Sequence, residues 1–328
     1  MGRKTDALER IATALERIAA ALERPPAAGV EAPAAPAPQS LRAEPAPAAA
    51  ALSTRVEAAP GAAPPPAGAL PGGEEAPAAP VAPPMGDRAD VLRAYLERHQ
   101  ISIKKERAPA PIDETLLPIA RLMGNHHATV KPVIDALKRA NTTGGPYTIV
   151  LREQPPVVVT NCVQLAHQLH ALALVEAFKY HKAPAYTLTL SPSRLPEAIN
   201  FITGGWLELY VRGVVQRAVA SARPGASHSL LENPQVSLPT GEDFELDLLL
   251  EVEGEVWWIE AKSGAYQKHI AKYKRVGRML GLPAERCTLV LCEANAELCA
   301  SLSGLFGMRV VGVADIAAAL TEGMRARA

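Results

Sequence analysis

Two acidic side chains and a lysine stand close together in one stretch of the sequence, residues 244–262 (FELDLLLEVEGEVWWIEAK). Asp247 falls in the first of two apolar runs, and Glu260 and Lys262 fall in the second. Side chains at i and i+2 point to the same face of a strand, so Glu260 and Lys262 point together. The break at residues 253–254 predicts a hairpin turn that brings Asp247 alongside Glu260. The sequence therefore predicts one pocket that holds two carboxylates and an ammonium group.

These three groups suit metal-assisted cleavage of a phosphodiester. Two carboxylates offer oxygen ligands to a hard cation such as Mg2+, which keeps some of its waters and takes further ligands from a phosphate. Lys262 would orient or help deprotonate a metal-bound water and stabilise charge on the phosphate. A solvated hairpin face often carries the same residue types. Here, however, Asp247 and Glu260 lie within apolar strands, where an unpaired charge is costly, and this favours the metal site.

A second motif, NFITGGWLELYV, occupies residues 200–211. Together with FELDLLLEVEGEVWWIEAKSG at residues 244–264, it resembles the PD-(D/E)xK nuclease domain of the CRISPR ancillary nucleases, which opens with a similar GGWLE helix motif. The resemblance covers about residues 195–312. It implies that Glu208 lies on the first helix of the nuclease core and completes an acidic trio with Asp247 and Glu260.

The resemblance also implies the roles of the site residues. The catalytic residues would be Lys262, Asp247, Glu260 and Glu208. The metal, Mg2+ or Mn2+, would be held at Asp247, Glu260 and Ala261. Leu209 stands where the wider family often has a second acid, and this leaves the number of metal ions open.

A basic amphipathic helix is predicted over residues 266–280, directly after the strand that carries Lys262, and it ends at a Gly and a Pro. Such a helix can aim polar groups at a bound phosphate. In related nucleases Gln, Tyr or Lys at such positions assists the chemistry, and we select Gln267 and Lys274 as substrate-binding residues. Lys268, Lys272 and Arg275 scatter around the helix and are interpreted as a solvated face.

The fold class expected for residues 193–328 is α/β, with a restriction-endonuclease-like core. Its order is α-β-β-β-α-β, with a closing helix. The expected elements are a helix at 196–217, a strand at 235–238, the two hairpin strands, the helix at 266–280, a strand at 287–291, a helix at 294–303, a strand at 309–312 and a helix at 314–324.

Residues 87–192 are predicted to form a winged helix-turn-helix domain. Helices are expected at 113–123, 129–140 and 160–170, with a strand at 147–151 and a hairpin over 172–190. The predicted recognition helix is 161–170, and Lys179 and Lys182 in the wing are candidate nucleic-acid contacts. Basic residues exceed acidic ones only modestly here, so a structural or dimerising winged helix remains the alternative.

The remaining N-terminal part divides in two. Residues 1–24 repeat apolar residues every three and four positions with a seven-residue period, which predicts a short coiled-coil helix. This helix would self-associate, dock on a partner protein or make no stable contact, and self-association is favoured. Residues 25–86 are rich in Ala and hold 16 of the chain's 30 prolines, which predicts a disordered linker.

Composition sets few further limits on the 328-residue chain. Its formal net charge is zero, so nucleic acid and membranes are neither indicated nor excluded by overall charge. The four cysteines show no C-x-x-C pairing and are interpreted as free thiols of a reducing cytoplasm. With no signal peptide and no apolar run of about 20 residues, we expect a cytoplasmic protein without membrane contact.

The expected function is a Mg2+- or Mn2+-dependent nuclease, an endonuclease rather than an exonuclease, in prokaryotic nucleic-acid processing or defence. DNA is favoured over RNA as the substrate. The alternative is a catalytically inactive nucleic-acid-binding or scaffolding protein that is recruited through its N-terminal helix. The CRISPR ancillary nucleases carry an N-terminal Rossmann-like sensor for cyclic oligoadenylates. The sequence leaves no room for one, so activation by a cyclic nucleotide is not expected.

Overall fold

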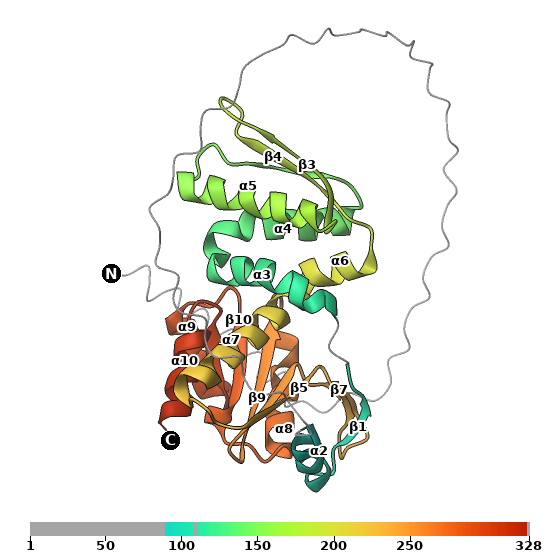
Figure 1. The fold of residues 1–328 in the computed structure, drawn as a ribbon, viewed down its shortest axis with the longest axis vertical. Coiled ribbons are helices and arrows are strands. Elements are labelled where there is room, and N and C mark those ends of the chain that lie inside the picture. The colour runs from blue at the N-terminus through green and yellow to red at the C-terminus, as the bar shows by residue number, and fades with distance from the viewer. Residues whose placement is uncertain (1–88, 108–110, 327–328) are drawn as a thin grey trace, which may run out of the picture. The chain divides into compact units, whose positions relative to one another are not determined.

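The computed structural model describes residues 89–107 and 111–326 (Figure 1). The predicted coiled-coil helix at 1–24 and the predicted linker at 25–86 lie outside the described residues. The chain that is described is a mixed α/β structure with three separate sheets. Within it, no helix combines the length and the apolar character needed to cross a bilayer.

Residues 111–192 carry three helices and a small antiparallel sheet. The elements are α3 (Pro111–Asn125), α4 (His127–Thr143), β2 (Tyr147–Val150), α5 (Pro156–Ala171), β3 (Val175–His181) and β4 (Thr187–Pro192). The strands lie in the order β2-β4-β3, so β3 and β4 form the predicted hairpin. Each helix and strand that the sequence predicted in this segment is present.

A long helical segment then leads into the predicted site. It begins as α6 (Pro196–Asn200), continues as a π-helical turn η1 (Phe201–Gly205) and ends as α7 (Trp206–Ala222). The helix predicted at 196–217 is confirmed, and the π-helical turn within it falls on the FITGG part of the motif. A π-helical turn inserted into an α-helix shifts the residues that follow it around the axis, and such turns are common at functional sites.

A five-stranded mixed sheet forms the centre of the C-terminal half. Its strands are β5 (His228–Glu232), β8 (Leu248–Val252), β9 (Glu255–Lys262), β10 (Cys287–Leu291) and β11 (Arg309–Gly312). They lie in the order β11-β10-β9-β8-β5, with β5, β8 and β9 antiparallel in turn and β9, β10 and β11 parallel. The predicted strands at 287–291 and 309–312 are confirmed to the residue.

The first strand of this sheet differs from the prediction. The strand predicted at 235–238 exists as β6 (Gln235–Ser237), but it lies in a separate sheet with β1 (Ser102–Lys105) and β7 (Asp243–Glu245), in the order β1-β6-β7. The strand that pairs with β8 is β5 instead. Its alternating half-buried and buried residues suit an edge strand, and the sequence pattern alone did not distinguish the two segments.

Two groups of helices cover the two faces of the five-stranded sheet (Figure 1). Apolar residues of α7 and α10 (Ile316–Arg325) pack in one cluster with Leu248, Leu250, Trp257 and Ile259. The other face, which includes Leu249 and Trp258, packs with α2 (Ala89–Arg98), α8 (Ile270–Met279) and α9 (Ala296–Phe306). The sequence analysis grouped segment 89–107 with the predicted domain of residues 87–192. In the structure, α2 packs against residues after 228, and β1 pairs with β6.

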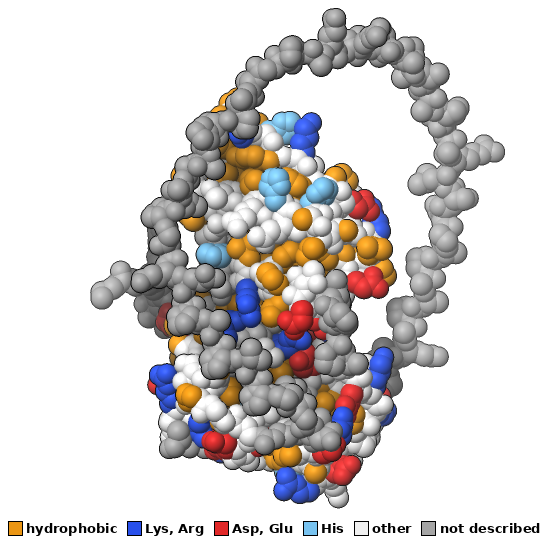
Figure 2. Space-filling model, in the orientation of Figure 1, with side chains coloured by type: hydrophobic (Ala, Val, Ile, Leu, Met, Phe, Trp, Pro, Cys, Tyr) orange, Lys and Arg blue, Asp and Glu red, His pale blue; other side chains and the backbone are white. Residues whose placement is uncertain are grey.

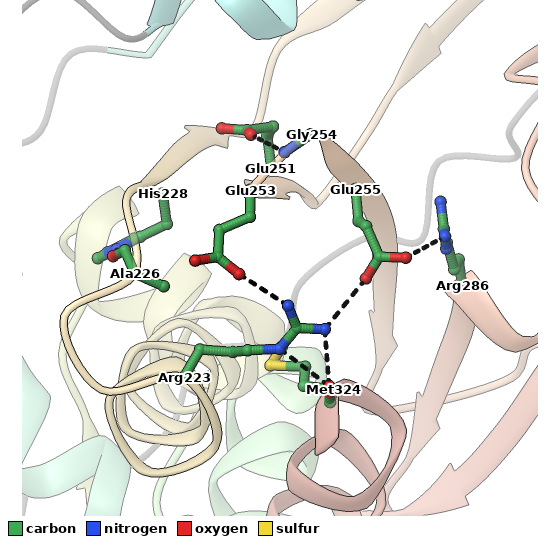
Figure 3. Close-up of polar contacts among 9 residues, drawn as sticks. All are labelled: Arg223, Ala226, His228, Glu251, Glu253, Gly254, Glu255, Arg286 and Met324. Carbon is green, nitrogen blue, oxygen red and sulfur yellow. Dashed lines mark hydrogen bonds and ion pairs between the residues drawn. The ribbon is translucent and has the colours of Figure 1, made fainter. Parts of the chain in front are cut away.

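The hairpin between β8 and β9 is held in place at its turn. Glu253 and Gly254 both adopt positive φ, 49° and 85°, as a tight two-residue turn requires. Arg223, just after α7, donates to the Glu253 carboxylate at 2.8 Å and to the Met324 carbonyl at 2.9 Å, and it also reaches Glu255 (Figure 3). Arg286 bonds the other oxygen of Glu255. These contacts hold the turn against the ends of α7 and α10, and so fix one end of both strands.

Candidate active site

The register of β8 and β9 brings the two predicted acids together. Leu248 faces Ile259 across the ladder, so Asp247, the residue before β8, stands opposite Glu260. Asp247 was predicted to lie on a strand, but it occupies the bend between β7 and β8. Its Oδ2 accepts a hydrogen bond of 2.7 Å from the Ala261 amide, and its own amide points to Glu260 Oε2 at 3.5 Å. The predicted juxtaposition of Asp247 and Glu260 is confirmed.

Lys262 joins the two carboxylates. Its Nζ lies 2.9 Å from Glu260 Oε1 and 3.3 Å from Asp247 Oδ2. The side chain of Glu260 is 2% exposed and that of Asp247 10%, whereas 28% of Lys262 reaches solvent. The ammonium group therefore stands between two buried acids and the surface.

Burial raises the pKa of both carboxyls, and the charge of Glu260 adds to the rise at Asp247. For Asp247 the largest cause is burial, followed by the charge of Glu260, and Lys262 opposes both. Burial likewise raises the pKa of Glu260, against the favourable charge and hydrogen bond of Lys262. Burial alone would lower the pKa of Lys262, but the two acids outweigh it and raise that pKa above its usual range. The pKa values of Asp247 and Glu260 stay raised despite Lys262, so its ammonium group does not fully compensate the burial of the two carboxylates.

Glu208 approaches the pair from α7. Its Oε2 accepts a hydrogen bond of 2.8 Å from the side-chain amide of Asn233, and the Asn233 backbone amide donates to the Asp247 carbonyl at 3.1 Å. The charge of Glu208 also contributes to the raised pKa of Asp247. Asn233 follows β5 with φ of 48°, a conformation that Asn adopts more readily than most residues. Asn233, which the sequence did not single out, thus links the helix acid to the sheet acid.

The helix after β9 contributes different residues from the two selected. Tyr273 is buried on α8, and together with His269 and Lys272 it lines the same depression as Glu260 and Lys262. Gln267 begins the 3-10 turn η2 (Gln267–His269) and is exposed, in a second depression that also reaches Lys262.

Lys274 is not brought to the acids, because it lies exposed on α8 beside Gly307. The helical spacing explains the difference. Tyr273 shares a face with the buried residues Val276 and Gly277, whereas Lys274 lies on the solvent face next to it.

A further chain of contacts fixes the end of β9. Ser263 follows Lys262, and its hydroxyl donates to the Thr203 carbonyl in the π-helical turn at 2.6 Å. Lys138 on α4 donates to the Ser263 carbonyl at 2.9 Å. The residue after the lysine of the motif is therefore held from both the π-helical turn and α4.

The donor set fits one hard cation. Among the described residues, no three His, Cys, Asp or Glu side chains converge as a ready metal cluster. Mg2+, however, is commonly bound through one or two carboxylates and keeps several waters. Asp247 and Glu260 provide those carboxylates, and burial is the main cause of their raised pKa values. Ala261 could offer only its backbone carbonyl.

The two wing lysines lie far along the chain from these acids, on the β3–β4 hairpin. Lys179 on β3 and Lys182 in the turn are both exposed. Figure 2 shows basic and histidine side chains beside hydrophobic ones over this hairpin and the neighbouring helix. Among the hydrogen bonds and ion pairs of the described residues, none connects Lys179 or Lys182 to Asp247, Glu260 or Glu208.

Comparisons with known proteins bear on the fold. No protein-family model and no curated protein matches the sequence. The crystal structure of protein VC1899 from Vibrio cholerae is similar with a TM-score of 0.50 and 18% identity, covering 71% of this chain and 60% of that one. The structure of Can2 from Sulfobacillus thermosulfidooxidans, in complex with cyclic tetra-adenylate, is similar with a TM-score of 0.49 and 16% identity, again covering 71% of this chain and 60% of that one. The chain thus spans 60% of each structure, and the likeness to VC1899 concerns the fold alone.

Proposed function

We propose that the protein is a nuclease that hydrolyses phosphodiester bonds with a divalent cation held at Asp247 and Glu260. The observation that carries the proposal is the buried pair of carboxylates, both with raised pKa, in contact with one lysine. Such an arrangement costs stability, and perturbed groups of this kind cluster at functional sites. The resemblance of the surrounding residues to the PD-(D/E)xK domain supports the same reading.

The residues of the chain would divide the work. Asp247 and Glu260 hold the cation, with the Ala261 carbonyl as a further ligand, and Glu208 adds a third acid from α7. When bound, the cation supplies positive charge that polarises a phosphoryl oxygen and acidifies water. Mg2+ and Mn2+ both suit oxygen ligands.

Lys262 acts through its charge. Because its pKa is raised, it stays protonated at neutral pH, so it stabilises negative charge on the phosphate rather than removing a proton from water. Tyr273 lies in the same depression as Glu260, and its hydroxyl would orient that carboxylate.

Residues 111–192 would deliver the substrate as a winged helix. The order helix, helix, strand, helix, hairpin supports that architecture, with α5 as the recognition helix and β3–β4 as the wing. Lys179 and Lys182 would contact phosphates there, and Gln267 would contact the substrate near Lys262. We favour DNA as the substrate, RNA as the second candidate, and endonucleolytic cleavage in prokaryotic nucleic-acid processing or defence.

The test compares Glu260→Gln with Glu251→Gln. Both acids are buried in the β8–β9 hairpin, but Glu251 lies near the turn, where it accepts a hydrogen bond from Gly254. Each purified protein is incubated with labelled single- and double-stranded DNA and RNA, with Mg2+, Mn2+ or EDTA. Cleavage should require the cation, persist in Glu251→Gln and disappear in Glu260→Gln. If the wild type binds substrate without cutting it, the non-enzymatic alternative is correct.

A further inference from the structure

A pocket of about 370 Å³ opens beside Glu208, and Lys262 is not among the residues that line it. It lies where α3 packs against α7 (Figure 1). Leu116, Phe201 and Leu209 line its apolar part, and Glu208 and Leu248, which follows Asp247, line it as well. Its size is within the range of small-molecule sites, and it adjoins the acids proposed for hydrolysis. We name it the α3–α7 pocket.

Arg212 gives the pocket a buried polar edge. Its side chain is 6% exposed and pairs with Glu114 at 3.1 Å and with Glu232 at 3.4 Å. Within the described chain, the buried Nε–H of Arg212 finds no acceptor. An unsatisfied buried donor is costly, and an incoming acceptor would relieve that cost. Glu232, which also lines the pocket, offers carboxyl oxygens next to this donor.

We propose that the α3–α7 pocket takes one nucleobase of the substrate, turned out of its stack, from the nucleotide next to the cleaved bond. The proposal rests on the proposed function. A base has two apolar faces that match the leucines and Phe201, and its edge carries acceptors for Arg212 and donors for Glu232. Other small ligands would share these contacts, but only a substrate base is tied to Glu208 and Asp247 by position.

The proposal implies a preference for unpaired substrate. A base in a duplex must break its pair and its stacking before it can enter such a pocket, whereas a base in a single strand pays much less. Single-stranded nucleic acid, or a distorted duplex, is therefore the substrate class that this site selects.

The test separates base binding from hydrolysis by using the Glu260→Gln background. Single-stranded DNA oligonucleotides with 2-aminopurine at one position each are titrated with the protein, because the fluorescence of this base rises when its stacking is lost. Leu116→Trp fills the pocket from α3. Leu122→Trp is the matched control, since Leu122 is also half-buried on α3 but does not line the pocket. Leu195→Trp, at an exposed rim position, provides a second blocking variant with less risk to folding.

We expect one 2-aminopurine position to brighten with the Glu260→Gln protein and with its Leu122→Trp derivative. In Leu116→Trp and Leu195→Trp that signal should be lost and the Kd raised about tenfold or more. An equal fluorescence change and Kd in the blocked and control proteins overturns the base pocket. The nuclease proposal fails separately, if Glu260→Gln cuts substrate as the wild type does.

Discussion

Asn233 and Glu208 are joined by a hydrogen bond of 2.8 Å from the asparagine amide to the glutamate Oε2. The same asparagine donates its backbone amide to the Asp247 carbonyl at 3.1 Å. One residue, at the end of an edge strand, therefore sets the distance between an acid on a helix and an acid at a hairpin. Because the proposed hydrolysis depends on how such groups are oriented, Asn233 would be a positioning residue.

Replacing Asn233 tests this positioning role. Asn233→Gly keeps the positive φ and the backbone bond to Asp247 but removes the amide from Glu208. We expect kcat to fall by about 10- to 100-fold while Tm changes little. Asn233→Asp places a carboxylate against Glu208 and should be at least as inactive. Unchanged turnover in both variants would show that the position of Glu208 does not depend on Asn233.

The acidic pair should cost the metal-free protein stability. Because the folded-state pKa of Asp247 is raised, its ionisation is less favourable in the folded chain than in the unfolded one. The penalty is complete above the raised pKa and is absent below the ordinary value of about 3.9. Asp247→Asn, which keeps an oxygen for the Ala261 amide, should therefore raise Tm in EDTA at pH 7.5 but not at pH 3.5. A lower Tm at pH 7.5 contradicts this account.

Lys262 should matter more to stability than a surface lysine. Lys262→Met leaves two buried carboxylates without their cation, and breaking a buried ion pair costs about 3 kcal/mol or more. The raised pKa of Lys262 places its contribution below about pH 10, so denaturant unfolding at pH 7 measures it in full. Adding Asp247→Asn to Lys262→Met should recover part of the lost free energy of unfolding. The control Lys268→Met, at an exposed position in η2, should cause no such loss. Additive effects of Lys262→Met and Asp247→Asn would exclude the coupling.

The hairpin and its acids could be predicted from the sequence because their signals are local. Alternation along residues 255–262 sets the face of Glu260 and Lys262, and the turn at Glu253 and Gly254 sets the register. Both apolar runs are buried almost throughout, because helices cover both faces of the sheet. The helix with the GGWLE motif and the strands at 287–291 and 309–312 were also predictable, since each is a contiguous pattern.

The parts that could not be predicted depend on contacts between distant segments. Nothing in the sequence around His228–Glu232 distinguishes it from Gln235–Ser237 as the partner of β8, because both are short and partly buried. Asn233 and Tyr273 gain their roles only when β5 and α8 are placed beside the acids. Tyr273 and Lys274 are neighbours in the sequence, so their side chains lie about 100° apart around the helix axis. The buried face of α8 decides between them.

The affinity for a cation should depend on pH, and this dependence should extend to higher pH than the usual pKa values of carboxyl groups would give. Since the pKa values of Asp247 and Glu260 are raised, protons compete with the cation at higher pH than at ordinary acids. We expect Mg2+ affinity, measured by calorimetry, to rise with pH and to level off only above those raised pKa values. Titration in two buffers of different ionisation enthalpy should reveal proton release on binding. Affinity that is constant between pH 5 and 8 would count against this competition.

Arg223 should support the fold without taking part in the chemistry. Its guanidinium bonds Glu253 and the Met324 carbonyl at the turn, at the opposite end of β8 and β9 from Asp247 and Glu260 (Figure 3). Arg223→Ala leaves that carbonyl and the Glu253 carboxylate without this donor, while Glu255 keeps Arg286, so we expect a loss of about 2 kcal/mol in the free energy of unfolding. Arg223→Lys should lose less, because it keeps the charge but not the planar fork. Below the melting transition kcat should stay within about twofold of wild type, because the register near Asp247 is also held by β5 and by the Ala261 amide. A large fall in kcat without a change in stability would mean instead that the turn controls the geometry of the acids.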